Sequence, residues 1–484
     1  MQTIKDLSPE KLWKYFDEIT KVPRPSKKEE KIIEYILDFA KKNNLKNHKD
    51  KIGNIVITKE STKGQEKKPK IVLQSHLDMV CEKNSQTAHN FDTDAIETIV
   101  DGEWLKANET TLGADNGIGV ATMLAILASD DIVHPALECL FTIDEETGLT
   151  GAKNLEKTSL SGKILINLDT EEEGDIYIGC AGGMDTIASF KYSQRAVEKG
   201  FSSYKVIVGG LTGGHSGDDI EKGRGNAVQI LGRFLWNSME LYDIRLAEID
   251  GGNKRNAIAR EAYAKFMVAP KLVKKFQEYF MEFVTDVKNE YAIVEPKLFL
   301  TLEETNTPPF LIDKDTKEHL LNALYACPHG VIAMSQAIPG LVETSTNLAS
   351  VKYDGEVIKV ATSQRSSIES AKKNIAKVVA NVFYMAGAKV EHSDGYPGWK
   401  PNPSSSFLKY AKETYTNLYG NEPHVKAIHA GLECGLLLEK FPDLDVISIG
   451  PSIRGAHSPE EKVHIPSVTK YWNYLLELLK GVPE

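Results

Sequence analysis

The chain has 484 residues, of which 41% are hydrophobic and 26% are charged. This composition is typical of a globular protein with enough apolar material for two or three domains. The net charge of −10 argues mildly against nucleic acid and anionic membrane surfaces as partners, because both carry negative charge. No apolar run approaches the roughly 18 residues that a membrane-spanning helix needs.

The N-terminal segment and the cysteines indicate the compartment. The opening "MQTIKDLSPEKLWKYF" is amphipathic and lacks the continuous apolar stretch of a signal peptide. The five cysteines are odd in number, are scattered along the chain and show no CxxC spacing. We therefore expect reduced thiols in a cytoplasmic protein rather than a disulfide framework.

Predicted helices and strands alternate in the first part of the chain and at its end. Two helices come first, and Ser26 and Glu29 have the spacing of a capping box at the start of the second. Strands are expected at "NIVITKE", "KIVLQSH", "ALECLFTI", "KILINLD" and "DVISIGP", and further helices at "GVATMLAILAS" and "SVTKYWNYLLELL". This alternation predicts an α/β domain with a mainly parallel, helix-covered sheet.

The middle of the chain has a different pattern. From about residue 185 to residue 392 the strands are longer and alternate polar with apolar residues, as in "YKVIVGGL" and "EVIKVATS". Helices such as "KKFQEYFMEFVTDV" lie between pairs of these strands. This is typical of a separate α+β layer. We therefore expect one domain made of residues 1–184 and 393–484, with a second domain inserted at 185–392.

Acidic and histidine residues gather where the predicted α/β strands end. In an open α/β sheet the carboxyl ends of the strands line the ligand crevice, so residues far apart in sequence can converge there. Imidazole nitrogens and carboxylate oxygens are ligands of zinc-like ions, and one carboxylate can bridge two ions roughly 3.5–4 Å apart. The residues concerned are His76, Asp78, Asp115, Glu145, Glu146, Asp169 and His457.

The adjacent Glu145 and Glu146 of "IDEETG" are the least expected part of this set. Neighbouring carboxylates repel each other, and a core strand has no use for them. We interpret one glutamate as a metal ligand and the other as a general base that takes a proton from the attacking water. A solvated acidic loop is the competing interpretation when the pair is taken alone.

The other candidates have ordinary interpretations as well. The HxD of His76 and Asp78 is a common tripeptide, and His457 could be a plain loop histidine. Asp115 is expected to cap the helix that begins near Asn116, whatever else it does. Five separate strand ends nevertheless each offer a hard ligand in one domain, and this favours a metal site.

Several motifs together resemble one known family. They are "SHLDMV", "LGADNGIG", "DEETGLTGA", "NLDTEEEGDIYIGCAGG", "GGHSG", "HAGLECG" and "GAHSP", with "WKYFDEITKVPRPS" near the start. The chain resembles the aminoacyl-histidine (Xaa-His, peptidase D) dipeptidases, which belong to a clan of co-catalytic zinc peptidases, aminoacylases and carnosinases. The resemblance covers almost the whole chain and implies a zinc-peptidase catalytic domain with an inserted lid domain.

The resemblance also implies a role for each of the clustered residues. Asp115 would bridge two Zn²⁺ ions, with His76 and Asp169 completing one site. Glu146 and His457 would complete the other. Asp78 would hold the His76 imidazole in its ligating tautomer. Glu145 would be the general base and would return the proton to the leaving amine. Cobalt and manganese accept the same ligands as zinc.

In the lid domain the resemblance points to substrate contacts. His215 of "LTGGHSGDDI" would stabilise the developing oxyanion. A phosphate-binding loop is the alternative for this stretch, but the GK[ST] ending is absent. Arg365 would bind the C-terminal carboxylate of the substrate. Asn256 would make a polar contact, and the backbone of Gly431 would approach the substrate terminus.

Some points in this region stay open. Arg255 and Arg260 compete with Arg365 for the carboxylate role, and a lone arginine is more often a surface residue. The roles of His429 and Glu433 in "HAGLECG" are undecided.

The function that follows is a cytoplasmic two-zinc dipeptidase acting on Xaa-His dipeptides such as Ala-His or carnosine-like substrates. An aminoacylase or another N-acyl amino acid amidohydrolase is the alternative, because it would share every metal ligand. A binding protein with structural metal is less favoured, since a closed structural site needs no spare base such as Glu145. No nucleic acid or membrane partner is expected. The sequence leaves open a homodimer through the lid domain.

Overall fold

The computed structural model describes residues 3–483, and this part of the chain divides into two compact units. Unit 1 comprises Met1–Gly179, Pro401–Ala427 and Leu432–Glu484. Unit 2 comprises Cys180–Lys400 and Ile428–Gly431. The segment 185–392, which we expect to be an inserted domain, lies within unit 2. Between residues 3 and 483 no helix is both long and apolar enough to cross a membrane.

A mixed sheet forms the centre of unit 1. Its strand order is β1-β2-β6-β3-β7-β23-β8-β22. The bounds are β1 Lys46–Lys49, β2 Ile55–Lys59, β3 Ile71–His76, β6 Leu137–Thr142, β7 Ile164–Asn167, β8 Asp175–Cys180, β22 His424–Ile428 and β23 Asp445–Ser448. The neighbours β6, β3, β7 and β23 pair in parallel. Every residue of β3 and β6 is buried, as expected for central strands with helices on both faces.

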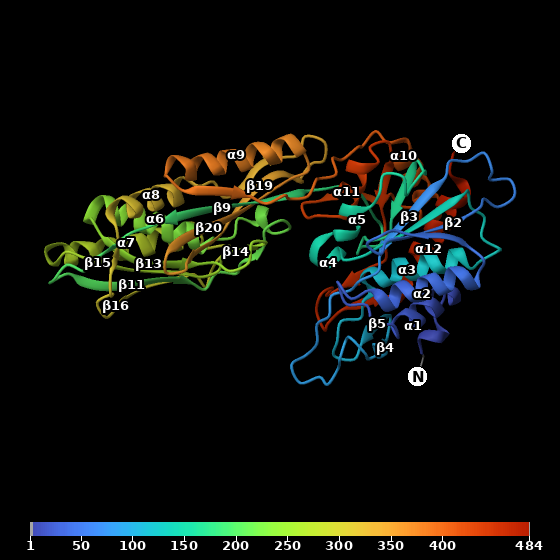
Figure 1. The fold of residues 1–484 in the computed structure, drawn as a ribbon, viewed down its shortest axis with the longest axis horizontal. Helices are drawn as coiled ribbons and strands as arrows, with labels where there is room; N and C mark the ends of the chain where they lie inside the picture. Colours follow the sequence, from blue (N-terminus) through green and yellow to red (C-terminus); the bar gives the residue numbers. More distant parts are fainter. Residues whose placement is uncertain (1–2, 484) are drawn as a thin grey trace. The chain divides into compact units, whose positions relative to one another are not determined.

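Helices cover this sheet. They are α1 Glu10–Ile19, α2 Glu30–Lys42, α3 Ala114–Leu127, α5 Thr150–Asn154, α10 Ser406–Tyr419, α11 Glu433–Lys440 and α12 Ile465–Gly481. In Figure 1, α1, α2 and α3 lie on one side of strands β2 and β3, and α10 and α11 lie on the other. Residues 116–127 of α3 are all buried, because this helix is apolar on every face. The predicted α/β class is confirmed.

A small second sheet in unit 1 has the order β24-β25-β5-β4. Its strands are β4 Thr98–Asp101, β5 Trp104–Ala107, β24 Ile453–Arg454 and β25 Lys462–His464. The turn between β24 and β25 carries His457. The backbone of His457 is left-handed, with φ 64°.

The capping box predicted for the second helix is wrong. Within the described residues, α2 begins at Glu30 and the side chain of Glu29 makes no capping hydrogen bond. Instead, Ser26 donates its hydroxyl to Oδ2 of Asp78 at 2.8 Å, and Glu29 accepts the N–H of Asp144 at 3.0 Å. The two residues thus support the loops that carry the acidic cluster.

Unit 2 is an antiparallel sheet with helices on one face (Figure 1). The strand order is β16-β11-β15-β13-β19-β20-β9-β21, and β18 also pairs with β19. The bounds are β9 Gly182–Lys191, β11 Ser202–Gly209, β13 Arg245–Gly251, β15 Ala262–Val268, β16 Phe299–Glu304, β18 Gly330–Met334, β19 Val342–Tyr353, β20 Val357–Ser366 and β21 Lys389–His392. The covering helices are α6 Ala227–Tyr242, α7 Val273–Glu290, α8 Lys314–Ala326 and α9 Glu369–Met385.

The core of unit 2 lies between these helices and the sheet. Phe234 of α6 is fully buried and its ring contacts Phe266 of β15 and Phe276 of α7. The alternating strands of unit 2 bury one face of the sheet against the helices. This is the open-faced α+β arrangement expected from the sequence. The short return segment Ile428–Gly431 also belongs to this unit, and it brings His429 and Gly431 to the lid residues.

Candidate metal centre and active site

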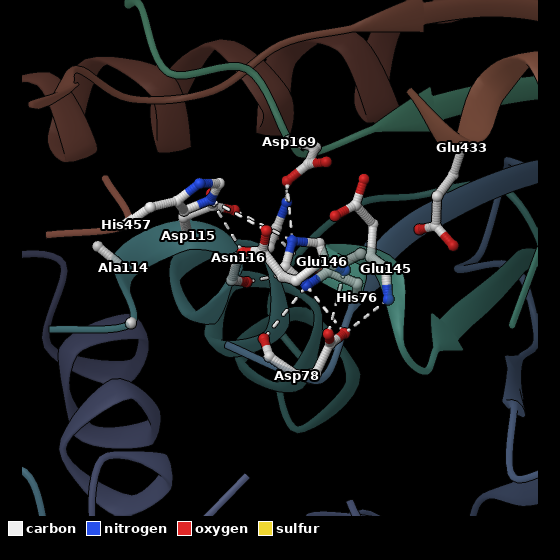
Figure 2. A network of polar contacts seen from close by, with 12 residues as sticks. His76, Asp78, Ala114, Asp115, Asn116, Glu145, Glu146, Asp169, Glu433 and His457 are labelled. Atoms are coloured by element: carbon white, nitrogen blue, oxygen red, sulfur yellow. Dashed lines mark hydrogen bonds and ion pairs between the residues drawn. The ribbon is translucent and has the colours of Figure 1, made fainter. Parts of the chain in front are cut away.

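The carboxyl ends of the parallel strands in unit 1 carry the clustered residues (Figure 2). His76 is the last residue of β3, and Asp169 follows the end of β7 by two residues. Glu145 and Glu146 open the short helix α4 Glu145–Gly148, which follows β6. Asp115 lies in the first turn of α3. Parallel strands end at the same edge of the sheet, so these side chains converge.

Among the described residues, two groups of potential metal ligands share Asp115. In the first, Nε2 of His76 lies 3.0 Å from Oδ1 of Asp115 and 3.4 Å from Oδ1 of Asp169. In the second, Nε2 of His457 lies 3.3 Å from Oδ2 of Asp115 and 3.0 Å from Oε2 of Glu146. The two oxygens of Asp115 therefore face different groups, which is what a bridging ligand requires.

The electrostatics of the cluster fit metal ions. Burial raises the pKa of Asp169 to about 6, although His76 opposes the shift. Hydrogen bonds with Asp115 and Glu146 raise the pKa of His457 to about 11. His457 therefore keeps a proton at neutral pH that a free imidazole would largely lose, and Asp169 releases its proton at a higher pH than a free carboxyl group does. Divalent cations would take the place of these protons, and nitrogen with carboxylate oxygen is a donor set that zinc, cobalt and manganese accept.

Glu145 lies next to these groups but outside both of them. It approaches His76, and the ligand atoms of His76, Glu145 and Glu146 all lie within 4.8 Å of one another. Burial raises the pKa of Glu145 well above its usual range; the imidazole of His76 opposes this shift and the carboxylate of Asp169 adds to it. A carboxyl group with a raised pKa beside a metal centre is suited to accept and return a proton.

Asp78 connects the imidazole to the glutamate pair. Its Oδ1 lies 3.3 Å from Nδ1 of His76, the nitrogen that faces away from Asp115. The same carboxylate accepts the backbone N–H of Glu145 at 3.0 Å and that of Glu146 at 3.2 Å. Asp78 thus orients His76 and also fixes the turn on which both glutamates sit.

A further acidic group lies behind this turn. Ligand oxygens of Glu29, Asp78 and Asp144 lie within 4.8 Å of one another, and all three residues are buried. The Asp144 carboxylate accepts the hydroxyls of Thr147 and Thr150, and Glu29 accepts the N–H of Asp144. Because protein donors already satisfy these carboxylates, we interpret the group as a support for the loop.

Asp115 does not cap its helix. In the described chain the N-cap position of α3 is Gly113, and the ψ of Asp115 is non-helical at 115°. Glu461 caps the helix instead: its carboxylate accepts the N–H of Leu112 at 2.8 Å, of Gly113 at 2.9 Å and of Ala114 at 2.7 Å. Asp115 keeps both oxygens for the metal groups because another carboxylate takes the orphan N–H groups.

Arg24 supports the same loop from the other side. Its buried guanidinium donates to the carbonyl oxygens of Leu77 at 3.0 Å and Asp78 at 2.9 Å, and to that of Gly113 at 2.5 Å. Gly113 has φ 70°, and an added Cβ would clash with the guanidinium and with Met79. Neither Arg24 nor Glu461 stood out in the sequence, since each acts on backbone atoms of a segment far away in the chain.

In unit 2 the structure brings some of the expected lid residues together. Arg365 of β20 is 7% exposed, and its Nη2 lies 3.4 Å from Nε2 of His215. Nδ1 of His215 lies 3.2 Å from Oδ2 of Asp218. Tyr396, which sequence reasoning missed, accepts a hydrogen bond from Nη1 of Arg365 at 3.1 Å. The buried His429 lies 2.7 Å from the Ser345 hydroxyl through Nε2, and Ser345 is the strand partner of Arg365.

The other lid candidates have different surroundings. Asn256 is exposed, and its backbone carbonyl accepts the N–H of Ser216 at 2.8 Å. Arg255 pairs with Asp185 at 2.6 Å and is largely exposed. Arg260 is exposed too. Of the three arginines considered for a carboxylate clamp, Arg365 is the buried one.

Residues 72–481 match the profile of the peptidase family M20/M25/M40. The chain belongs to this peptidase family.

Individual members of the peptidase family agree with this assignment. The chain is 43% identical over 483 residues to the cytosol non-specific dipeptidase of Escherichia coli (strain K12), and 100% of both chains is covered. The crystal structure of the aminoacylhistidine dipeptidase from Vibrio alginolyticus has a TM-score of 0.93 and 42% identity, covering 100% of this chain and 99% of that one. The resemblance to aminoacyl-histidine dipeptidases is therefore confirmed.

More distant structures share the fold alone. A tripeptidase from Staphylococcus aureus has a TM-score of 0.57 and 19% identity, covering 98% of this chain and 99% of the other.

The geometry predicts the effect of one substitution at the shared ligand. Asp115→Asn keeps the shape of the side chain but removes the charge that faces both groups. We expect the variant to retain close to no zinc, whereas wild type should hold about two ions per chain, because both sites lose the same ligand. Metal analysis of protein purified with zinc measures this. Asp131→Asn, at an exposed surface carboxylate, is the matched control. Equal zinc content in Asp115→Asn and wild type would contradict the shared role.

Proposed function

We propose that the chain is a two-metal dipeptidase that cleaves dipeptides, including those with C-terminal histidine. The observation that carries the proposal is Asp115, whose two oxygens face two separate His and carboxylate groups. The Escherichia coli and Vibrio alginolyticus relatives are named as dipeptidases, which supports the same substrate class. The first name describes a non-specific dipeptidase and the second an aminoacylhistidine dipeptidase.

The ligand sets follow from the two groups. His76, Asp115 and Asp169 would hold one ion, and Asp115, Glu146 and His457 the other. The ions, Zn²⁺ in our proposal, would supply Lewis acidity toward the peptide carbonyl and the attacking water. Asp78 keeps His76 oriented by its contact with Nδ1, so that Nε2 faces the metal side.

Glu145 moves the proton. We assign it this role because it lies beside His76, is partly buried and belongs to neither group that contains Asp115. It takes a proton from the attacking water at its carboxylate and passes it to the nitrogen of the leaving amine. The hydrogen bond from its backbone N–H to Asp78 fixes the turn from which its side chain extends.

The residues of unit 2 would bind the substrate. Arg365 would hold the C-terminal carboxylate, which limits the substrate to one residue beyond the scissile bond. His215 would donate to the developing oxyanion. A polar contact from Asn256 and a backbone contact from Gly431 to the substrate both stay predictions. Gly431 also leaves room for the ring of Tyr396, because an added Cβ would lie 2.7 Å from the ring.

We propose a cytoplasmic location, in line with the name of the Escherichia coli relative and with the scattered free cysteines. A homodimer through unit 2 stays a prediction.

The proposed activity is tested by comparing two substrate classes. Protein stripped with EDTA should be inactive on Ala-His, and added zinc should restore hydrolysis. N-acetyl amino acids should be cleaved at least about 100-fold more slowly, because their acyl group lacks the free α-amino group of a dipeptide. Release of histidine or of acetate, measured by chromatography, separates the two activities. Faster cleavage of N-acetyl amino acids would favour the aminoacylase alternative and overturn the dipeptidase proposal.

The two adjacent glutamates should respond differently to substitution. Glu145→Ala should keep wild-type zinc content but lose about 100-fold or more in turnover, the usual scale for a missing general base. Glu146→Ala should lose zinc as well as activity. Metal analysis and initial rates on Ala-His measure both effects, with the exposed Glu156→Ala as control. If the two variants have the same zinc content and the same turnover, the assignment of Glu145 as the general base and Glu146 as a metal ligand is wrong.

A further inference from the structure

Tyr396 occupies a fixed position in unit 2. Its backbone pairs with Gly183 of β9: the N–H of Tyr396 donates to the Gly183 carbonyl at 2.9 Å, and the N–H of Gly183 donates to the Tyr396 carbonyl at 3.1 Å. The ammonium group of Lys372, whose side chain is buried, also donates to the Tyr396 carbonyl at 2.5 Å. The same ammonium group forms an ion pair with Glu369 at 2.8 Å, so Lys372 links the Tyr396 backbone to α9.

The ring of Tyr396 packs against two glycines. A Cβ added at Gly183 would lie 2.7 Å from Cε1 and Cζ of the ring, and one at Gly431 would lie 2.7 Å from Cε2. Contacts this short are not tolerated, so side chains at these two positions would displace the ring. The two glycines come from segments far apart in the sequence, and both leave room for the same aromatic side chain.

The hydroxyl of Tyr396 determines how Arg365 is held. It accepts a hydrogen bond from Nη1 of Arg365 at 3.1 Å. Within the described residues, Nε of Arg365 is buried and has no hydrogen-bond partner. Nη2 lies 3.4 Å from Nε2 of His215, which is a long contact. A buried donor without a partner is costly, and in a native protein it points to a ligand.

The geometry of the guanidinium defines that ligand. Nε and Nη2 point their N–H groups from the same edge of the planar group, and Nη1 lies on the other side. A carboxylate accepts two parallel hydrogen bonds from such an edge. Because Tyr396 binds Nη1, the edge that remains for a ligand is the one suited to a carboxylate.

We propose that Tyr396 is a positioning residue that holds the Arg365 guanidinium through Nη1, so that the Nε and Nη2 edge binds the C-terminal carboxylate of the dipeptide. This inference rests on the proposed function of Arg365. The inference also explains why glycines occupy positions 183 and 431: they allow the Tyr396 ring to lie where its hydroxyl reaches the guanidinium. The backbone contact of Gly431 with the substrate stays a separate prediction.

Tyr396→Phe tests the inference by removing one oxygen atom and leaving the ring. We expect KM for a free-acid dipeptide to rise about 3- to 10-fold with kcat within about twofold of wild type, the scale of one hydrogen bond. The preference for the free acid over the C-terminal amide should fall by a similar factor. Tyr384→Phe is the control, because this tyrosine of α9 is 53% exposed. Gly183→Ala should shift the ring and reduce the preference in the same direction.

The same substrates in Arg365→Ala separate the inference from its premise. If wild type does not prefer the free acid, or if Arg365→Ala keeps the preference, the assignment of Arg365 is wrong. If Arg365→Ala loses the preference while Tyr396→Phe retains it, the role of Tyr396 is wrong and that of Arg365 stands. The double variant should match Arg365→Ala alone, since Tyr396 acts through the arginine. A further loss in the double variant would contradict the positioning role.

Discussion

The crowding of carboxylates around Asp115 is the constraint on which the structure of unit 1 depends. Two like charges about 4 Å apart repel each other by about 4 kcal/mol at an effective dielectric constant near 20. A folded domain has only about 5–15 kcal/mol of net stability, so several such pairs could not be left uncompensated. Burial raises the pKa values of Asp169 and Glu145, and neighbouring carboxylates add to the shift, so protonation relieves part of this repulsion in the chain without ions. Two divalent cations would also offset this repulsion, and the two oxygens of Asp115, which face different ligand groups, are placed to bind both of them.

Much of the surrounding structure keeps this cluster in place. Glu461 accepts the N–H groups at the start of α3, and Arg24 donates to carbonyls of the same loop and of Leu77 and Asp78. Asp78 fixes the turn that carries Glu145 and Glu146. Each of these side chains is buried, and each makes hydrogen bonds to backbone groups of these loops; Asp78 also contacts Ser26 and His76. Rigid placement of this kind reduces the reorganisation that the reaction would otherwise require.

The sequence predicted those parts of the fold that follow from periodicity. The apolar strands ending at His76 and Asp169, the buried helix α3 and the change to alternating strands in the middle of the chain were all visible. The convergence of the candidate ligands followed from one rule, that parallel strands end at the same edge of a sheet. The family resemblance supplied their individual roles, which periodicity alone could not.

The errors and omissions have a common physical cause. Two local capping patterns were misleading: the spacing of Ser26 and Glu29, and the position of Asp115 at a helix start. Ser26 and Glu29 form hydrogen bonds with residues far away in the chain, and Asp115 faces His76. Arg24, Glu461 and Tyr396 were missed because their partners are backbone atoms or side chains brought close only by folding. Local rules predict local hydrogen bonds, and a buried polar site is built from long-range ones.

The most direct test of this account is a crystal structure of the zinc-loaded chain with anomalous data collected at the zinc edge. The account predicts two strong anomalous peaks, one among His76, Asp115 and Asp169 and the other among Asp115, Glu146 and His457. Both peaks should lie within ligand distance of Asp115, roughly 2.0–2.2 Å from a carboxylate oxygen. A single peak, or a peak at Glu29, Asp78 and Asp144 instead, would contradict it.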